Sequence, residues 1–279
     1  MPKLLTGAPV SAAIYAQVRA KAALPGVRPC LAAVSVGAQP DDLAYLHSIT
    51  QAADAAGIAV RPVPLPADCA PGTLADTLRA LSADGAVHGV LLLRPLPEAL
   101  RAQELLDTLD PRKDVDGMTT ASLGALVTGA AGFAPCTAEA CMALLRAHGI
   151  DPAGKRVTIV GRSLVIGRPA ALLFTRADAT VTLCHRKTPD LAACCRAADI
   201  LLAAAGAPGC ITPGCVHPGQ IVLDAGATAL PDGTLRGDVT PEAAAIAAAC
   251  TPVPGGIGSV TTALLLQHTV QAAENFRHF

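Results

Sequence analysis

Short apolar runs alternate with longer segments rich in alanine and leucine along most of the chain. The short runs are continuously apolar, which is typical of strands that are covered on both faces of a parallel sheet. They lie at 30–36, 87–93, 157–160, 180–184, 200–204 and 221–225. The longer segments predict helices at about 9–22, 41–56, 71–83, 137–148, 167–177 and 259–277. Strands that alternate with helices indicate βαβ units, so we expect an α/β protein with parallel sheets.

A break in this alternation falls at 128–137, where the sequence TGAAGFAPCT is rich in glycine, alanine and proline. It predicts a boundary between two α/β domains, which suits a chain of 279 residues. The last predicted helix follows the turn PVPGGIG at 252–258. The pattern alone leaves open to which domain this helix returns.

Composition narrows the class of protein. The formal net charge is −1, which argues against a general nucleic-acid binder, because such proteins carry a basic stripe. No run approaches the ~20 apolar residues that a bilayer span needs, and the first residues lack the pattern of a secretory signal. We therefore expect a cytoplasmic protein that binds neither nucleic acid nor membrane.

The chain contains ten cysteines, and none of their spacings matches a zinc site. We expect no metal. The simplest interpretation is that the cysteines are reduced and mostly buried, and that they pack as small apolar side chains.

The most informative local pattern follows the predicted strand 157–160. That strand ends at Gly161, and Arg162, Ser163 and, six residues after the first glycine, Gly167 come next, before a predicted helix. A strand, a glycine turn and a helix in this order direct backbone N–H groups and a helix dipole at a phosphate. The spacing is GxxxxxG and not GxGxxG, so the motif alone fits an ordinary strand–helix turn equally well.

The next predicted strand strengthens the dinucleotide interpretation. It ends in His185, Arg186 and Lys187. In a dinucleotide-binding fold the end of the second strand faces the adenosine ribose, where an acidic residue favours NAD. Basic residues at this place, together with Arg162, suit a 2′-phosphate. We therefore expect NADP as the cofactor; the alternative is a solvated basic strand end.

Taken together, the motifs resemble the bifunctional methylenetetrahydrofolate dehydrogenase/cyclohydrolase family. The resemblance runs nearly from end to end of the chain. It rests on LAAVSVG at 31–37, GVLLLRPLP at 89–97, KDVDG at 113–117, PCT at 135–137, VGRSLVIGRP at 160–169, TVTLCHRKT at 180–188, ADILLAAAGAPG at 198–209, GDV at 237–239 and TPVPGGIGSVTTALLL at 251–266.

The resemblance implies a folate domain at 1–140, completed by the C-terminal helix 262–279, and a Rossmann-type NADP-binding domain with a parallel sheet at 141–261. It also implies an active site in the cleft between the two domains, and a homodimer. The implied chemistry is oxidation of 5,10-methylenetetrahydrofolate to the methenyl form, with NADP as hydride acceptor, and then hydrolysis to 10-formyltetrahydrofolate.

The resemblance also implies roles for particular residues. Tyr45 would stack on the pterin, and Asp116 would accept hydrogen bonds from the amino-pyrimidine edge. The substrate loop would contain Pro254, Gly255 and Gly256. The cofactor-binding residues would be Gly161, Arg162, Ser163, Gly167, His185, Arg186 and Thr228.

Two substitutions depart from the family pattern. The family lysine that lies four residues after the tyrosine, on the same helix face, is Ile49 here, and the glutamine that bonds this lysine is Leu93. Hydrolysis needs proton transfer, whereas hydride transfer mainly needs alignment of the reacting carbons. Arg94 is a poor substitute because arginine stays protonated. We therefore expect the dehydrogenase to persist and the cyclohydrolase to be weak or lost.

Further departures lie near the substrate loop, where Ser259 and Val260 replace a usual Pro-Met pair. They leave two alternatives open. One is an enzyme on the same scaffold that acts on a different folate-like substrate. The other is a catalytically inactive protein that binds NADP.

Overall fold

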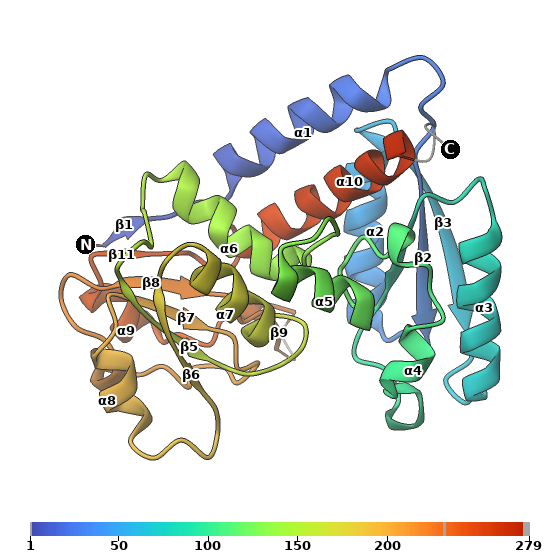
Figure 1. Ribbon diagram of the computed structural model, residues 1–279. Helices are drawn as coiled ribbons and strands as arrows, with labels where there is room; N and C mark the ends of the chain where they lie inside the picture. Colours follow the sequence, from blue (N-terminus) through green and yellow to red (C-terminus); the bar gives the residue numbers. More distant parts are fainter. Residues whose placement is uncertain (1, 231–232, 276–279) are drawn as a thin grey trace. The chain divides into compact units, whose positions relative to one another are not determined.

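The computed structural model describes residues 2–230 and 233–275 and divides the chain into two compact units. Unit 1 comprises Met1–Ala12 and Thr137–Thr261, and unit 2 comprises Ala13–Cys136 and Thr262–Phe279. Both are α/β units with parallel sheets, as predicted (Figure 1).

Unit 1 is built on a six-stranded sheet in the order β1-β11-β8-β7-β5-β6, and its neighbouring strands all pair in parallel. The strands are β1 (Lys3–Leu4), β5 (Arg156–Val160), β6 (Thr180–Cys184), β7 (Ile200–Ala203), β8 (Ile221–Asp224) and β11 (Ala249–Cys250). The strand order reverses at β5, because β6 lies on one side of it and β7 on the other. In open parallel sheets, ligands bind at the carboxyl ends of the strands beside such a reversal.

Helices cover the central strands of this sheet, and a small antiparallel ribbon adjoins it. The elements are α6 (Cys136–Ala147), α7 (Gly167–Arg176), α8 (Leu191–Arg196), η3 (Pro213–Cys215), α9 (Pro241–Ile246) and the ribbon β9 (Thr228–Ala229) and β10 (Leu235–Arg236). Residues of α8 and α9 share one core cluster with side chains of β5, β7 and β8. The alternate strand residues Ile159, Leu202 and Leu223 are buried as well. Successive strand residues point to opposite faces, so both faces are covered.

Unit 2 contains a three-stranded parallel sheet in which β2 (Cys30–Val36) lies between β3 (Ala59–Leu65) and β4 (Gly89–Leu92). Its helices and turns are α2 (Pro40–Asp54), α3 (Pro71–Ala83), η1 (Glu98–Leu100), α4 (Gln103–Leu106), η2 (Pro111–Lys113) and α5 (Thr120–Thr128). It also contains the greater parts of α1 (Ala8–Ala22) and α10 (Ile257–Asn275), whose first residues belong to unit 1. Leucines of α3 pack on β2 and β4 and form the core of this unit. This core supports the loops that follow β2 and β4.

One long strand departs from the sequence prediction. The pattern predicts no strand at 59–65, because Pro62 and Pro64 interrupt the apolar run there. The structure places β3 at the edge of the sheet. Residues two apart in a strand direct their backbone N–H positions to the same side, so both prolines can lack that donor on the open edge without loss of a ladder bond.

The two units also differ in two places from the domains expected at 1–140 with 262–279 and at 141–261. Residues 1–12 group with unit 1, because β1 pairs with β11. The central division falls after Cys136 instead of after residue 140, because the residues from Thr137 on group with those up to Thr261. The end of the expected final helix, 276–279, lies outside the described residues.

The described residues contain neither a helix suited to cross a bilayer nor a cluster suited to bind a metal. No helix among them has the length and apolar character that crossing a bilayer requires. No group of histidine, cysteine, aspartate and glutamate side chains in the described ranges has the arrangement of a metal site. All ten cysteines lie within the described residues, and none of them is part of a disulfide.

Candidate functional site

Tyr45 and Ile49 lie one turn apart on α2. The helix begins with Pro40 in its first turn, and the carboxylate of Asp42 accepts a hydrogen bond from the Gln39 backbone N–H at 2.9 Å, which fixes its start. The Tyr45 residue is 41% exposed, whereas Ile49 is 0% exposed. The Tyr45 ring is therefore available at the surface of unit 2. One turn later, Ile49 places a buried hydrocarbon side chain where the family pattern has an ionisable lysine.

Leu93 and Arg94 follow β4. The backbone N–H of Leu93 donates to the Val34 carbonyl at 2.9 Å, which continues the pairing of β4 with β2, and its side chain is buried. Arg94 is half-buried, and its positive charge acts to lower the pKa of Asp116. The end of β4 thus carries the apolar side chain of Leu93 and, next to it, the guanidinium of Arg94, whose charge acts on the Asp116 carboxylate.

Asp116 lies beneath the segment 133–136. Its Oδ1 accepts a hydrogen bond from the Cys136 backbone N–H at 3.3 Å. Gly117 has φ +63°, and a Cβ there would lie 2.6–2.7 Å from backbone atoms of Phe133 and Pro135. Only glycine therefore allows the segment 133–135 to pass this close to residue 117. Burial is the main cause that raises the pKa of Asp116.

Tyr45 and Asp116 interact electrostatically. Burial raises the pKa of the Tyr45 phenol first, and the negative charge of Asp116 raises it further. The tyrosine is consequently neutral at physiological pH. Unit 2 therefore brings together an aromatic ring, a carboxylate and the guanidinium of Arg94, whereas Ile49 and Leu93 contribute no polar group.

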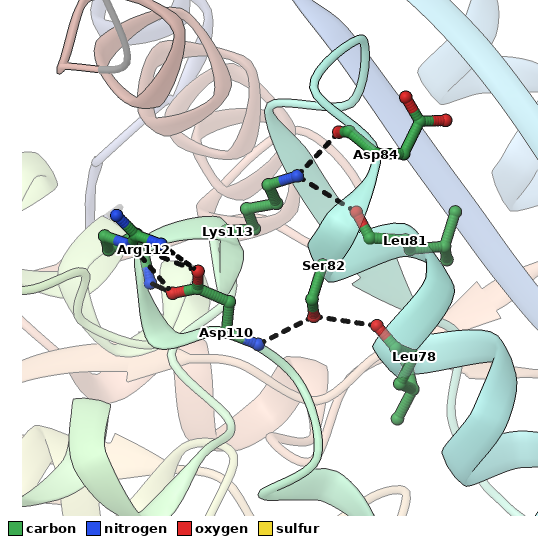
Figure 2. A network of polar contacts seen from close by, with 7 residues as sticks. All are labelled: Leu78, Leu81, Ser82, Asp84, Asp110, Arg112 and Lys113. Carbon is green, nitrogen blue, oxygen red and sulfur yellow. Dashed lines mark hydrogen bonds and ion pairs between the residues drawn. The ribbon is translucent and has the colours of Figure 1, made fainter. Parts of the chain in front are cut away.

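The other charged residues of the KDVDG motif are structural. The Lys113 Nζ is buried and donates to the carbonyls of Leu81, at 3.0 Å, and Asp84, at 2.7 Å, at the C-terminal end of α3 (Figure 2). A cation at a helix C-terminus is favourable because the carbonyls there carry partial negative charge. The Asp114 carboxylate accepts hydrogen bonds from the Thr119 backbone N–H and hydroxyl and so holds the start of α5. Of the three charged residues, Asp116 is the one left for a ligand.

Replacing Lys113 tests this division of roles. Lys113→Met is expected to lower the free energy of unfolding by about 1–3 kcal/mol, since it leaves buried carbonyls without their donor. Urea denaturation measures the loss. Arg112→Met is the matched control: Arg112 pairs with Asp110 on the surface, so a much smaller loss is expected. A weaker effect for Lys113 than for Arg112 would contradict the structural role.

Cys136 and His268 support the Asp116 loop, and neither had a role predicted from the sequence. The Cys136 thiol donates to the Val115 carbonyl at 3.3 Å, and the His268 Nδ1 lies 2.8 Å from the same carbonyl oxygen. The His268 ring packs on Phe133, with ring centroids 4.8 Å apart. A histidine inside the apolar run of α10 was the available signal, because a buried polar group needs a partner.

In unit 1, the turn between β5 and α7 leaves no space for a side chain at Gly161 or Gly167. Gly161 has φ +124°, and a Cβ on it would collide with the Ala204 carbonyl at the end of β7. A Cβ on Gly167 would collide in turn with the Gly161 carbonyl. The two glycines thus let α7 begin directly against the point where the strand order reverses. This cradle suits a dinucleotide phosphate, because it exposes backbone at a helix N-terminus.

Ser163 and Arg162 complete the turn in different ways. The Ser163 Oγ accepts a hydrogen bond from the Ile166 backbone N–H at 3.1 Å, and its carbonyl accepts one from the Arg168 N–H at 3.1 Å. The Arg162 side chain is exposed. The serine therefore shapes the loop, and the arginine is free to extend toward an anionic ligand.

The end of β6 forms a closed turn that exposes two basic side chains. The His185 backbone N–H donates to the Thr188 Oγ1 at 2.9 Å, and the Lys187 N–H donates to the His185 Nδ1 at 3.2 Å. Arg186 and Lys187 are exposed. The histidine ring thus braces the turn, and the two cations project from it.

Asp238 holds the loop after β7. Its carboxylate is 0% exposed and accepts hydrogen bonds from the backbone N–H groups of Ala205 at 2.6 Å, Gly206 at 3.0 Å and Ala207 at 2.8 Å. Its own N–H donates to the Asp224 Oδ1 at 3.0 Å. The GDV motif did not predict this clamp, since its partners lie about thirty positions earlier in the chain.

The remaining predicted residues lie on the loop before α10 and on the β9–β10 ribbon of unit 1. Pro254 and Gly255 are exposed, and Gly256 is buried. Gly255 has φ +99°, and its carbonyl accepts a hydrogen bond from the Gly7 N–H at 2.8 Å. Thr228 is half-buried in the β9–β10 ribbon. Their contacts with a ligand remain predictions.

Comparison with known proteins agrees with this geometry. Residues 135–277 match the family described as tetrahydrofolate dehydrogenase/cyclohydrolase, NAD(P)-binding domain, and residues 5–116 match its catalytic domain. The bifunctional protein FolD 1 of Rhodococcus jostii is 48% identical over 251 residues, which are 89% of this chain and 84% of that protein.

Solved structures agree as well. The FolD methylenetetrahydrofolate dehydrogenase/cyclohydrolase of Campylobacter jejuni superposes with a TM-score of 0.94 at 36% identity, over 99% of both chains. The Trypanosoma brucei enzyme, solved with NADP and an inhibitor, gives 0.92 at 34% identity, over 99% of both chains. The fold and the glycine turn thus define a two-unit α/β protein with an NAD(P)-binding domain. The chain belongs to the tetrahydrofolate dehydrogenase/cyclohydrolase family.

Proposed function

We propose that the protein oxidises 5,10-methylenetetrahydrofolate to 5,10-methenyltetrahydrofolate with NADP, and that it hydrolyses the methenyl product weakly or not at all. The observation that carries this proposal is the fully buried Ile49, one turn after the exposed Tyr45. The aromatic ring and the Asp116 carboxylate are retained, while the ionisable group expected at position 49 is absent.

Tyr45 and Asp116 bind the substrate in this proposal. The carboxylate accepts hydrogen bonds from the amino-pyrimidine edge of the pterin, and the neutral phenol ring stacks on its face. The Cys136 backbone N–H donates a hydrogen bond to the Asp116 Oδ1 at 3.3 Å, and this bond orients the carboxylate. Positioning of this kind is what hydride transfer mainly requires of the protein.

The glycine turn and the basic turn would hold the dinucleotide. Gly161, Gly167 and Arg162 would contact the pyrophosphate, and Arg186 with Lys187 would pair with the 2′-phosphate. NADP supplies the hydride acceptor when bound. The family match to an NAD(P)-binding domain and the NADP complex of the Trypanosoma brucei relative support this assignment.

In this proposal, hydrolysis lacks the lysine amine that the family resemblance places at position 49. Arg94 is the basic side chain whose charge reaches Asp116, and a guanidinium stays protonated, so it cannot accept a proton from water. General acid–base catalysis typically contributes ~10²–10⁴-fold to such a step. The methenyl product should therefore leave the enzyme before it is hydrolysed.

A coupled absorbance assay tests the proposal. Purified protein is mixed with methylenetetrahydrofolate and NADP, and NADPH and the methenyl product are followed together. Accumulation of methenyltetrahydrofolate in step with NADPH is expected. Passage to the 10-formyl product without accumulation would contradict the loss of cyclohydrolase. Binding of NADP in a calorimeter without NADPH formation would favour a different folate-like substrate or an inactive protein.

The choice of cofactor is a separate prediction. Arg186→Ala combined with Lys187→Ala is expected to raise the KM for NADP about 10–100-fold, because charge-assisted hydrogen bonds contribute ~1.5–3 kcal/mol. The KM for NAD should change little. Arg176→Ala, an exposed arginine in the last turn of α7, is the control. Equal losses with both dinucleotides would show that the basic turn does not read the 2′-phosphate.

Assembly and location complete the proposal. We propose a cytoplasmic homodimer, in accordance with the family resemblance, that binds neither nucleic acid nor membrane. Sedimentation equilibrium would give twice the chain mass if the dimer forms.

A further inference from the structure

The first residues of the chain belong to unit 1 and lead to the loop 254–256, which the family resemblance assigns to the substrate. The backbone N–H groups of Lys3 and Leu5 donate to carbonyls just before β11 and at its end, at 2.8 and 2.9 Å, so β1 lies beside β11 (Figure 1). Gly7, two residues further on, donates its N–H to the Gly255 carbonyl at 2.8 Å. The series of bonds that begins in β1 therefore continues to this loop.

Gly7 also lies directly before α1. Its carbonyl accepts the Ser11 backbone N–H at 2.8 Å, which is the bond between residues four apart that an α-helix makes. Gly7 is itself buried, and so is Leu5 before it. The backbone of Gly7 is therefore held by the loop through its N–H and by the helix through its carbonyl.

The space around Gly7 is closed by the loop and by the start of α10. A Cβ on Gly7 would collide with the Gly256 carbonyl oxygen and with the Ser259 Oγ. The Ser259 Oγ in turn donates to the same Gly256 carbonyl at 2.8 Å. Gly7 does not have a positive φ, so it is the lack of space, and not the backbone conformation, that requires glycine here.

We propose that Gly7 is a positioning residue for the dehydrogenase reaction: its N–H and its missing side chain set the place of the loop 254–256, and this loop aligns the folate substrate. Gly7 acts through the backbone of Gly255 and Gly256. Hydride transfer depends on the alignment of the reacting carbons, and a displacement of ~1 Å can cost ~10²-fold in rate. This role rests on the proposed function, because the contact of the loop with folate does.

Gly7→Ala tests the positioning role. The variant is expected to lower kcat/KM for methylenetetrahydrofolate about 10–100-fold, because the added methyl group must displace the Gly256 carbonyl and the loop with it. The Kd for NADP, measured by calorimetry, should change little, since the glycine turn at Gly161 packs on the Ala204 carbonyl. A merely structural role would lower stability and leave the kcat/KM of the folded variant unchanged.

Gly72→Ala is the matched control. Gly72 also lies at the start of a helix, α3, but a Cβ on it would have no atom within 4 Å. Its replacement should leave both kcat/KM and the Kd for NADP unchanged. A folded Gly7→Ala variant with the wild-type kcat/KM would overturn the proposal. An equal loss of NADP affinity in Gly7→Ala would overturn it as well, because it would mean that unit 1 is disturbed as a whole.

A double-mutant cycle tests whether residue 7 acts through these contacts. Ser259→Ala removes one of the two atoms that the added methyl group would meet. The double variant Gly7→Ala with Ser259→Ala should therefore keep more kcat/KM than the product of the two single losses predicts. Independent losses would show that the effect of residue 7 does not pass through the packing against the loop and the start of α10, which contradicts the proposal.

Hydrogen exchange of the wild-type chain, read by mass spectrometry, needs no variant to fold. The Gly7 amide is expected to exchange at least about tenfold more slowly than in an unstructured peptide, because it donates to Gly255. Saturating methylenetetrahydrofolate without NADP should slow it further. Exchange at the unstructured rate would overturn the proposal. If the wild-type chain oxidises no methylenetetrahydrofolate, the proposed function fails, while the exchange rate of the free chain still decides whether Gly7 holds the loop.

Discussion

Ile49→Lys combined with Leu93→Gln is expected to increase hydrolysis of methenyltetrahydrofolate by about 10²–10⁴-fold, the range that a positioned proton-transfer group supplies. The lysine would lie one turn after Tyr45 on α2, and the glutamine would offer it a hydrogen-bond partner from the end of β4. The measurement is the rate at which methenyl absorbance decays with enzyme, compared with buffer alone. The dehydrogenase rate should change much less.

The single substitutions separate chemistry from packing. Ile49 is 0% exposed, so Ile49→Lys alone places an amine in a buried apolar site and should destabilise the fold. Ile49→Met keeps the volume without the amine and should gain no hydrolysis. If the folded double variant retains its dehydrogenase activity and still hydrolyses nothing, the site has diverged beyond these two positions, and the explanation given for the lost activity is wrong.

Asp238→Ala is expected to have the largest effect on stability. The carboxylate is fully buried and accepts three backbone N–H groups from the loop after β7. Hydrogen bonds to a charged group contribute ~1.5–3 kcal/mol each, but water can reach the three donors, which belong to exposed residues, so we expect a total loss of about 3 kcal/mol. Chemical denaturation of the purified variant measures it.

Asp238→Asn is the matched variant, because it keeps one acceptor oxygen and the same size. It should lose less stability than alanine and should weaken dinucleotide binding, since the loop from Ala205 to Ala207 begins beside Gly161 at the reversal of strand order. A loss below about 1 kcal/mol for Asp238→Ala would mean that water or another side chain replaces the carboxylate.

The elements that were predictable from the sequence are those with a continuous apolar pattern. The strands β2 and β6 and the helix α3 have the bounds that the pattern predicts. The strand β3 was missed because its prolines are acceptable only at a sheet edge, and edge position is a tertiary property. The short helices α8 and α9 were missed because six residues carry too little periodicity.

The candidate site shows the same limit. The motif KDVDG indicated a functional segment, yet the sequence did not reveal that Lys113 binds carbonyls at the end of α3 and that Asp116 belongs to the site. That distinction depends on carbonyls about thirty residues away. The clamp by Asp238 escaped detection for the same reason. A buried polar residue is visible in a sequence, but its partner is decided by the fold.

The partition of the polypeptide between the two units has a consequence for engineering. The chain passes from one unit to the other after Ala12, after Cys136 and after Thr261. A single scission anywhere between residues 13 and 261 therefore divides both units. Expressing the dinucleotide-binding unit by itself therefore requires a gene that joins residues 1–12 to residues 137–261 and leaves out the segments between and after them.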